Sequence, residues 1–176
     1  MNQPQANTSQ IYIGTQNGVV VCVDRILRGD LIGKFYHSYS LEAQEFLNLG
    51  HLLFQMETLF NELKFPYPST NERHFHENPS PDTGRAANRS YHEEKREKIM
   101  NDEQLLMKHG DLGSFIIRVQ HRQNSSWQGR ITWIEKNKTV YFRSVWEMMK
   151  LIENAIDSVA PRENEEPEPG WPDSAE

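Results

Sequence analysis

Apolar residues recur along the first half of the chain at two different spacings. Residues 18–26 are rich in valine, and residues 31–39 are rich in aromatic side chains beyond an Arg-Gly-Asp turn. Two such runs predict a β-hairpin, and residues 43–46 predict a short third strand. The spacing then becomes helical, with apolar side chains at Leu49, Leu52, Leu53, Met56, Leu59, Phe60 and Leu63. We therefore expect a helix that begins after an Asn48 cap and ends just before Pro66.

The second half repeats this order of patterns. Residues 115–122 and 127–135 predict a hairpin around a polar turn, and residues 139–142 predict a short strand. Ser144, followed three residues later by a glutamate, forms a capping-box pattern that predicts the start of a helix. The apolar stripe of this helix comprises Val145, Met148, Met149, Ile152, Ile156 and Val159. Pro161 ends it.

The two halves align without a gap when the chain is shifted by 96 positions. Four identical pairs coincide, namely Val23/Val119, Gly33/Gly129, Phe46/Phe142 and Glu57/Glu153. Either the halves arose by duplication, or two unrelated units look alike because the same physics shapes both. One hairpin with one helix buries too little apolar area to be stable alone. We therefore expect a single α+β domain, in which two tandem β-hairpin-helix repeats form one pseudo-symmetric sheet with the helices packed on one face.

Composition divides the chain into five segments. The two repeats span residues 11–65 and 105–161, and a polar, proline-containing linker, residues 66–104, joins them. We expect residues 1–10 and the acidic tail, residues 162–176, to be disordered. The tail carries six acidic residues and one Arg, so removing it from the net charge of −6 leaves −1 for the rest. A near-neutral body neither indicates nor excludes a nucleic-acid partner.

Several classes of protein are disfavoured by what the sequence lacks. A single cysteine, Cys22, cannot form an intramolecular disulfide, and its valine-rich strand is typical of a buried thiol. The polar first ten residues do not resemble a signal peptide, and no apolar run approaches about 20 residues. His74, His76 and His92 lie in the linker without a further ligand at a recognised spacing. We therefore expect a cytoplasmic, non-enzymatic protein with no membrane span, cofactor, metal or catalytic residue.

One face of the predicted second-half sheet is basic. Side chains alternate across a strand, so Phe115, Ile117 and Val119 should meet the helices. The opposite face then carries the binding candidates Arg118, Gln120, Arg122 and Arg130, with Tyr36 on the corresponding face of the first half. Trp127 either packs beneath its turn or anchors a partner. This face is either a site for phosphates and acidic side chains or an ordinary solvated surface.

The motif RQNxxWQG at residues 122–129, followed by FRSxxE at residues 142–147, resembles a pattern in small uncharacterised proteins of Gram-positive, clostridial-type bacteria. The resemblance covers only the second half, and it implies a bacterial cytosolic origin without an activity. The order of several strands and one helix, occurring twice, is similar to the PUR and Whirly single-strand nucleic-acid binders. Those families use a basic, aromatic-bearing sheet face, but none of their motifs is present here.

These features lead to two functional hypotheses. In the first, the protein is a non-enzymatic binding or adaptor protein that acts through protein–protein contacts, and the Leu/Met-rich helical stripes offer a homodimer surface. In the alternative, it binds single-stranded nucleic acid through the basic face. Arg118, Gln120, Arg122 and Arg130 would contact phosphates, and Trp127 or Tyr36 would stack on a base. An enzyme of unrecognised type is a third, less favoured interpretation.

Overall fold

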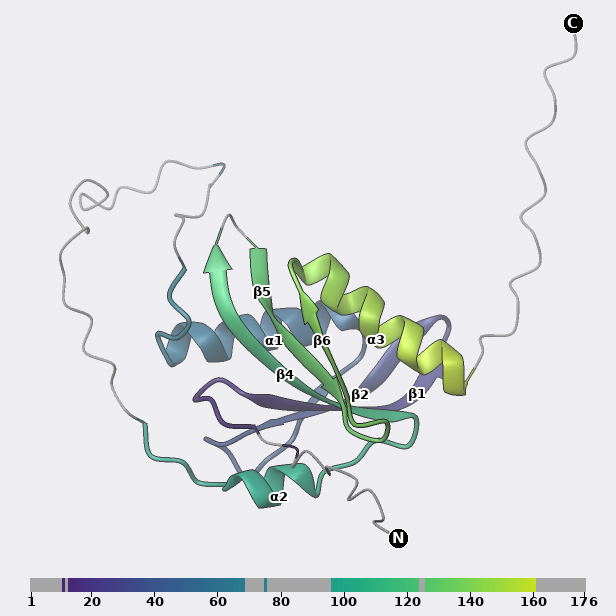
Figure 1. Cartoon of the computed structure of the whole chain (residues 1–176), viewed down its shortest axis with the longest axis horizontal. Helices are drawn as coiled ribbons and strands as arrows, with labels where there is room; N and C mark the ends of the chain where they lie inside the picture. The colour runs from purple at the N-terminus through teal and green to yellow at the C-terminus, as the bar shows by residue number, and fades with distance from the viewer. Residues whose placement is uncertain (1–10, 12, 69–74, 76–95, 124–125, 161–176) are drawn as a thin grey trace, which may run out of the picture.

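A computed structural model describes residues 11, 13–68, 75, 96–123 and 126–160 of the chain (Figure 1). The described residues form an α+β fold with a six-stranded antiparallel sheet and three helices, which confirms the predicted class. The elements are β1 (Val19–Leu27), β2 (Asp30–His37), β3 (Gln44–Phe46), α1 (Leu49–Glu62), α2 (Asp102–Leu106), β4 (Gly113–Gln123), β5 (Ser126–Trp133), β6 (Lys138–Phe142) and α3 (Val145–Val159). Both predicted hairpins and both predicted third strands are present.

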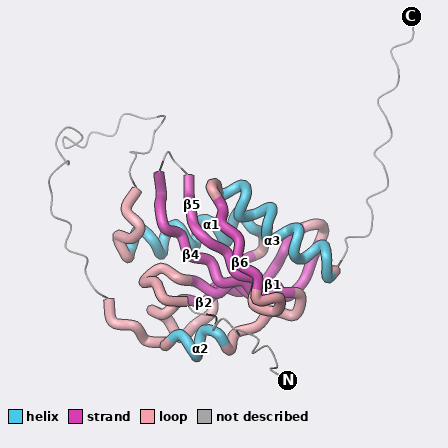
Figure 2. Tube along the Cα trace, viewed as in Figure 1, coloured by secondary structure: helices cyan, strands magenta, loops and turns pink. Residues whose placement is uncertain are grey.

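The sheet runs in the order β3-β2-β1-β4-β5-β6. Strands β4, β5 and β6 lie side by side in Figure 2. The two hairpins meet at its centre, where β1 pairs antiparallel with β4 and Val20 lies opposite Ile116. Neither hairpin therefore exposes its inner strand, because each inner strand completes the other's hydrogen bonding. The outer strands of the sheet are β3 and β6.

Helices α1 and α3 cover one face of the sheet and close the larger hydrophobic core. Leu52 and Met56 of α1, and Ile152 and Ile156 of α3, are fully buried there beside alternate residues of the central strands. The centres of both helical stripes thus lie inside the molecule rather than on a surface where a second copy could use them. No helix of the described ranges has the length and apolar character needed to span a membrane.

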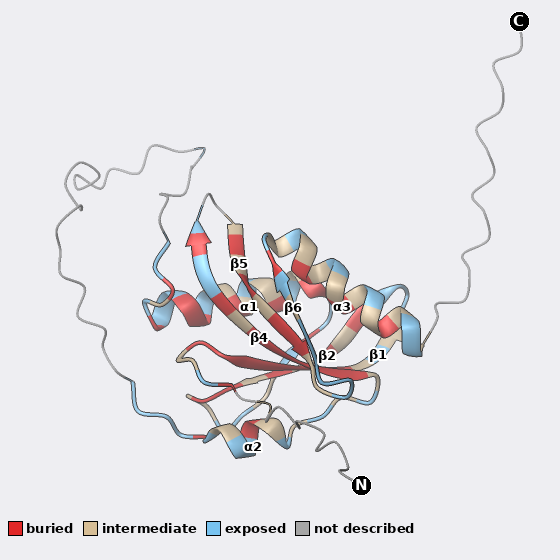
Figure 3. Cartoon of the chain, viewed as in Figure 1, coloured by how far each residue is buried: buried red, intermediate tan, exposed pale blue. Residues whose placement is uncertain are grey.

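The opposite face is partly covered by α2, which lies across the sheet from α1 and α3 (Figure 1). Met100 and Leu105 pack there with Val20, Cys22 and Ile116 in a second buried cluster. In Figure 3 the central strands are largely buried, and α2 carries one buried stretch among half-buried and exposed residues. The end of the predicted linker is therefore part of the fold. Periodicity missed α2 because five residues are too few to reveal a helical spacing, although its capping box was readable.

Each half contains a glycine on its middle strand directly opposite a phenylalanine. Gly33 faces Phe46, and Gly129 faces Phe142. A Cβ at either glycine would collide with a carbonyl oxygen of the neighbouring inner strand, and each Phe ring lies over the vacant place. The shared Gly and Phe of the sequence alignment are thus two partners of one packing arrangement.

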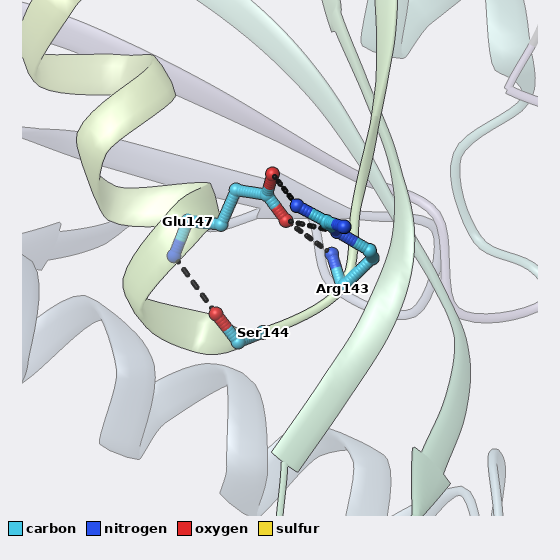
Figure 4. Close-up of polar contacts among 3 residues, drawn as sticks. All are labelled: Arg143, Ser144 and Glu147. Carbon is cyan, nitrogen blue, oxygen red and sulfur yellow. Dashed lines mark hydrogen bonds and ion pairs between the residues drawn. The ribbon is translucent and has the colours of Figure 1, made fainter.

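Both predicted helix caps are present. Asn48 Oδ1 accepts a hydrogen bond from His51 N at 2.8 Å, and Ser144 Oγ accepts one from Glu147 N at 3.1 Å (Figure 4). The Glu147 carboxylate reaches back to Arg143, one residue before the cap, and accepts from its main-chain N at 2.7 Å. Hydrogen bonds from the main chain and the side chain of Arg143 hold the pKa of the Glu147 carboxyl below its usual range.

Candidate binding sites

The structure separates the six residues predicted to bind a partner. Arg118 on β4 lies directly opposite Arg130 on β5, both half-buried, and Gln120 is exposed further along the same strand. The Arg130 guanidinium also lies 5.8 Å from the ring centre of Tyr141 on β6, whose side chain is 67% exposed. Two arginines and an aromatic ring therefore share the side of the second hairpin that faces away from α1 and α3.

Arg122 does not share this face. A bulge between Val119 and His121 shifts the alternation by one residue, so Arg122 turns toward α1 and is only 5% exposed. Its Nε donates to the carbonyl of Pro66 at 2.6 Å, and its Nη1 donates to Asn61 Oδ1 at 2.7 Å. Arg122 thus fastens the end of α1 to the sheet. The alternation of apolar and polar residues could not predict this position of Arg122, because a bulge leaves no reliable pattern in the sequence.

The Trp127 side chain packs in the core and does not project from the surface. It pairs with Arg122 across the hairpin, is 7% exposed, and its ring meets Phe60 of α1 edge-on at 5.3 Å between ring centres. Tyr36 lies on β2, on the other side of β1 from the arginines, with Lys108 Nζ 5.1 Å from its ring centre. Neither aromatic ring is brought beside the Arg118–Arg130 pair.

Two hollows that the sequence did not indicate flank the helix-covered face. The first, here called the apolar hollow, has a volume of about 270 Å³ and lies where α3 meets β4, β5 and β6. Its apolar walls are Phe115, Ile131, Trp133, Val140, Leu151 and Ala155, and the polar residues Lys138, Asn154 and Ser158 also line it. Lys136 Nζ lies 5.7 Å from the Trp133 ring centre, so two lysines stand at this end of β6.

The second, here called the polar hollow, has a volume of about 240 Å³ and lies where α1 meets β2 and β3. Its principal side chains are His37, Tyr39, Gln44, Gln55, Glu62 and Arg96, and Ser40, Thr58 and Leu59 complete it. The Arg96 guanidinium pairs with the Glu62 carboxylate at 3.2 Å, and both side chains are about half exposed. The charges of the hollow thus balance.

His37 is a neutral, oriented group in the polar hollow. Its side chain is 6% exposed, and burial lowers its pKa below 6.5, although the nearby Glu62 carboxylate opposes that change. Nδ1 accepts a hydrogen bond from Tyr39 N at 3.2 Å, so in the neutral ring Nε2 carries the proton. His37 Nε2 lies 3.2 Å from Gln44 Nε2, and because two facing N–H groups would repel, the Gln44 amide must be turned to present its oxygen to that proton.

The two hollows occupy corresponding places in the two halves. Six residues of the polar hollow precede residues of the apolar hollow by 96 positions, in the pairs His37/Trp133, Gln44/Val140, Gln55/Leu151, Thr58/Asn154, Leu59/Ala155 and Glu62/Ser158. The positions are thus the same, but the chemistry differs. The sequence alignment contained these pairs, but without the fold nothing distinguished them from other aligned positions.

Cys22 contributes no reactive group to these sites. Burial raises the pKa of the Cys22 thiol to about 12, with a smaller contribution from Asp24, so the thiol stays protonated at neutral pH. Within the described residues no three His, Cys, Asp or Glu side chains gather closely enough to hold a metal ion. His74, His76 and His92 lie outside the described residues.

The chain matches no protein-family model, no curated protein and no solved structure. The resemblance of residues 122–147 to clostridial-type bacterial proteins therefore stays a prediction that rests on the motif alone.

Proposed function

We propose that this protein is a non-enzymatic binding protein that takes an extended segment of a partner protein along β6, beside α3. The observation that carries the proposal is the position of the apolar hollow. It lies directly beneath an outer strand of the sheet, between Val140 on that strand and Leu151 and Ala155 on the helix. A strand edge and an apolar recess at the same place supply the two parts of β-strand addition.

The edge supplies main-chain hydrogen bonds. β6 pairs only with β5 among the described strands. In an antiparallel ladder alternate residues exchange both hydrogen bonds with one neighbour, so the remaining residues of β6 direct their N–H and C=O groups outward. An added strand would satisfy these groups whatever its sequence.

The apolar hollow supplies selectivity. Every second side chain of an added strand points to the helix side of the sheet, where the hollow receives an aliphatic or aromatic group. Lys136 and Lys138 at one end favour a partner with an acidic residue there. We thus expect a segment that alternates apolar residues and carries a carboxylate near one end.

The test is selection of peptides from a random library displayed on phage, with the full chain as the target. Peptides so obtained should alternate apolar residues and include acidic ones. Their Kd, measured by fluorescence anisotropy, should rise at least about tenfold for Ala155→Trp, which fills the apolar hollow. Phe54→Ala, a change at an exposed aromatic of α1, serves as the control and should leave Kd unchanged. Failure to select any binder, or equal affinity for Ala155→Trp, would overturn the proposal.

A second candidate function, single-stranded nucleic-acid binding, is favoured by the Arg118–Arg130 pair. The two arginines lie directly opposite each other on neighbouring strands, and a phosphate between them would accept hydrogen bonds from both guanidinium groups. Gln120 lies beside the pair, and Tyr141, rather than Tyr36 or Trp127, is the ring placed to stack on a base. Oligonucleotide affinity should fall steeply with added salt and vanish in the double variant Arg118→Glu, Arg130→Glu. No binding at low salt would eliminate this candidate.

We also propose that the two halves are diverged copies related by a pseudo-twofold axis through the Val20–Ile116 pair. The β1–β4 register supports this, because residues 96 positions apart exchange places across it, as in Val19↔Ile117 and Val21↔Phe115. The bulges of both hairpins, both Gly–Phe pairs, both caps and both hollows also recur at this spacing. Chance similarity of two hairpin-helix units would not require the same bulge position.

A further inference from the structure

We infer that the polar hollow binds a small neutral polyol, of the size and chemistry of a monosaccharide. This site is separate from the proposed peptide groove, since it lies on the other half of the molecule, beside β3 rather than β6. The inference therefore does not depend on the proposed function. Three properties of the hollow support it: its charge, its hydrogen-bonding groups and its size.

The charge of the hollow selects a neutral ligand. His37 is neutral, as its hydrogen bond from Tyr39 N and its burial require. Glu62 and Arg96 neutralise each other at 3.2 Å. A ligand that carried a net charge would lose its hydration without a free counter-charge among the described side chains of the hollow, so a neutral molecule fits better.

The hydrogen-bonding groups select vicinal hydroxyls. The Glu62 carboxylate only accepts and the Arg96 guanidinium only donates, so a neighbouring pair of groups on the ligand must do both. Thr58 Oγ1 donates to Phe54 O at 2.9 Å and keeps only its acceptor capacity for a ligand. A diol satisfies such a mixed set, because each hydroxyl both donates and accepts.

Gln55 lines the hollow and has a side-chain oxygen without a hydrogen-bond partner among the described residues. Its Nε2 donates to Glu45 O at 2.9 Å and lies 3.1 Å from His51 Nε2, which fixes the orientation of the amide. Its Oε1 is buried and has no hydrogen-bond partner among the described residues. A buried acceptor left unpaired costs free energy, and a ligand hydroxyl that reached it from the hollow would recover that cost.

The volume sets the size of the ligand. About 240 Å³ lies below the range of roughly 300 to 1,000 Å³ that holds drug-sized molecules. A monosaccharide, a cyclitol or a shorter polyol is of suitable size, whereas an oligosaccharide would have to extend into solvent. Tyr39 supplies an aromatic side chain of the kind that a sugar ring can pack against.

The experiment is an NMR titration of the full chain with glucose, ribose, inositol and glycerol, together with methylammonium and acetate as probes of opposite net charge. Side-chain resonances of His37, Gln44 and Gln55 should shift saturably with at least one polyol, at a millimolar Kd. Saturable binding of a charged probe without binding of any polyol would overturn the inference, and so would no saturable shift at all.

The second half provides a matched variant. Gln44→Val with Gln55→Leu installs the residues found at Val140 and Leu151, which occupy the corresponding places of the apolar hollow. The fold should tolerate the pair, and polyol affinity should fall at least about tenfold. The reciprocal pair, Val140→Gln with Leu151→Gln, should leave polyol affinity unchanged. Wild-type affinity in the first pair would overturn the assignment of the polyol to this hollow.

Discussion

Single residues decide which surfaces of this molecule are available. Arg122 and Trp127 carry the side chains that most often anchor partners, and both are buried. Arg122 lies in the core because a bulge shifts the phase of β4, whereas Trp127 lies there in regular alternation with Gly129 and Ile131 along β5. Arg118 precedes that shift on β4, Arg130 lies on the unshifted strand β5, and both remain on the side that the alternation predicted. Sequence alternation is therefore informative only up to the first irregularity of a strand.

His37 makes stability depend on pH. Its pKa in the folded protein is lowered from 6.5 by burial, with Glu62 and Arg96 as the charged groups that face it. As pH falls below about 6.5, the unfolded chain gains a proton that the folded protein resists, so the free energy of unfolding decreases until the folded pKa is reached. Above about pH 6.5, the neutral His37 ring contributes fully to the free energy of unfolding.

Urea unfolding at about pH 7.5 and pH 5.5 measures this dependence. The wild-type protein should lose more stability between the two values than His37→Gln, which has no titrating ring at that position. His121→Gln, a change at an exposed histidine of β4, is the matched control. Equal losses in all three proteins would show that His37 does not titrate between the folded and unfolded states as described.

At the scale of elements, the sequence predicted what local chemistry controls. Caps, turns and the periodic stripes of α1 and α3 were readable, since each depends on neighbours within a few residues. Helix α2 was too short to show a helical spacing. The two hollows and the burial of the segment before α2 were not readable either, because they form only when residues far apart in sequence meet. Met100, for example, is buried by contacts with strands that begin some 80 positions earlier.

The Ser144 cap tests this local chemistry. Ser144→Ala removes the acceptor for Glu147 N, and we expect the free energy of unfolding to fall by about 1 kcal/mol. Ser158→Ala, near the other end of α3, removes an exposed hydroxyl that donates to Ala155 O and should cost less than about 0.5 kcal/mol. Urea denaturation of both variants makes the comparison. Equal effects would mean that the cap does not hold the start of the helix.

At the scale of the whole molecule, the two halves depend on each other. The central β1–β4 pair and the core shared by α1 and α3 both cross from one half to the other. The need for a shared core was predictable from the small apolar area of each unit. The pairing that creates it was not, because the sequence does not reveal which strand of each hairpin lies inside.

Cutting the chain between residues 95 and 96 would separate the two hairpin-helix units while leaving every described helix and strand intact. Each fragment alone would expose one long edge, β1 or β4, and the apolar face of one helix, so neither should unfold cooperatively by circular dichroism in urea. Mixed in equal amounts, the fragments should recover a cooperative transition, because β1 and β4 can pair again and both helices then cover one sheet. The midpoint should rise with fragment concentration, as association by mass action requires. Two fragments that each unfolded cooperatively alone would contradict the shared core, and the arrangement of both hollows around it would then have to be reconsidered.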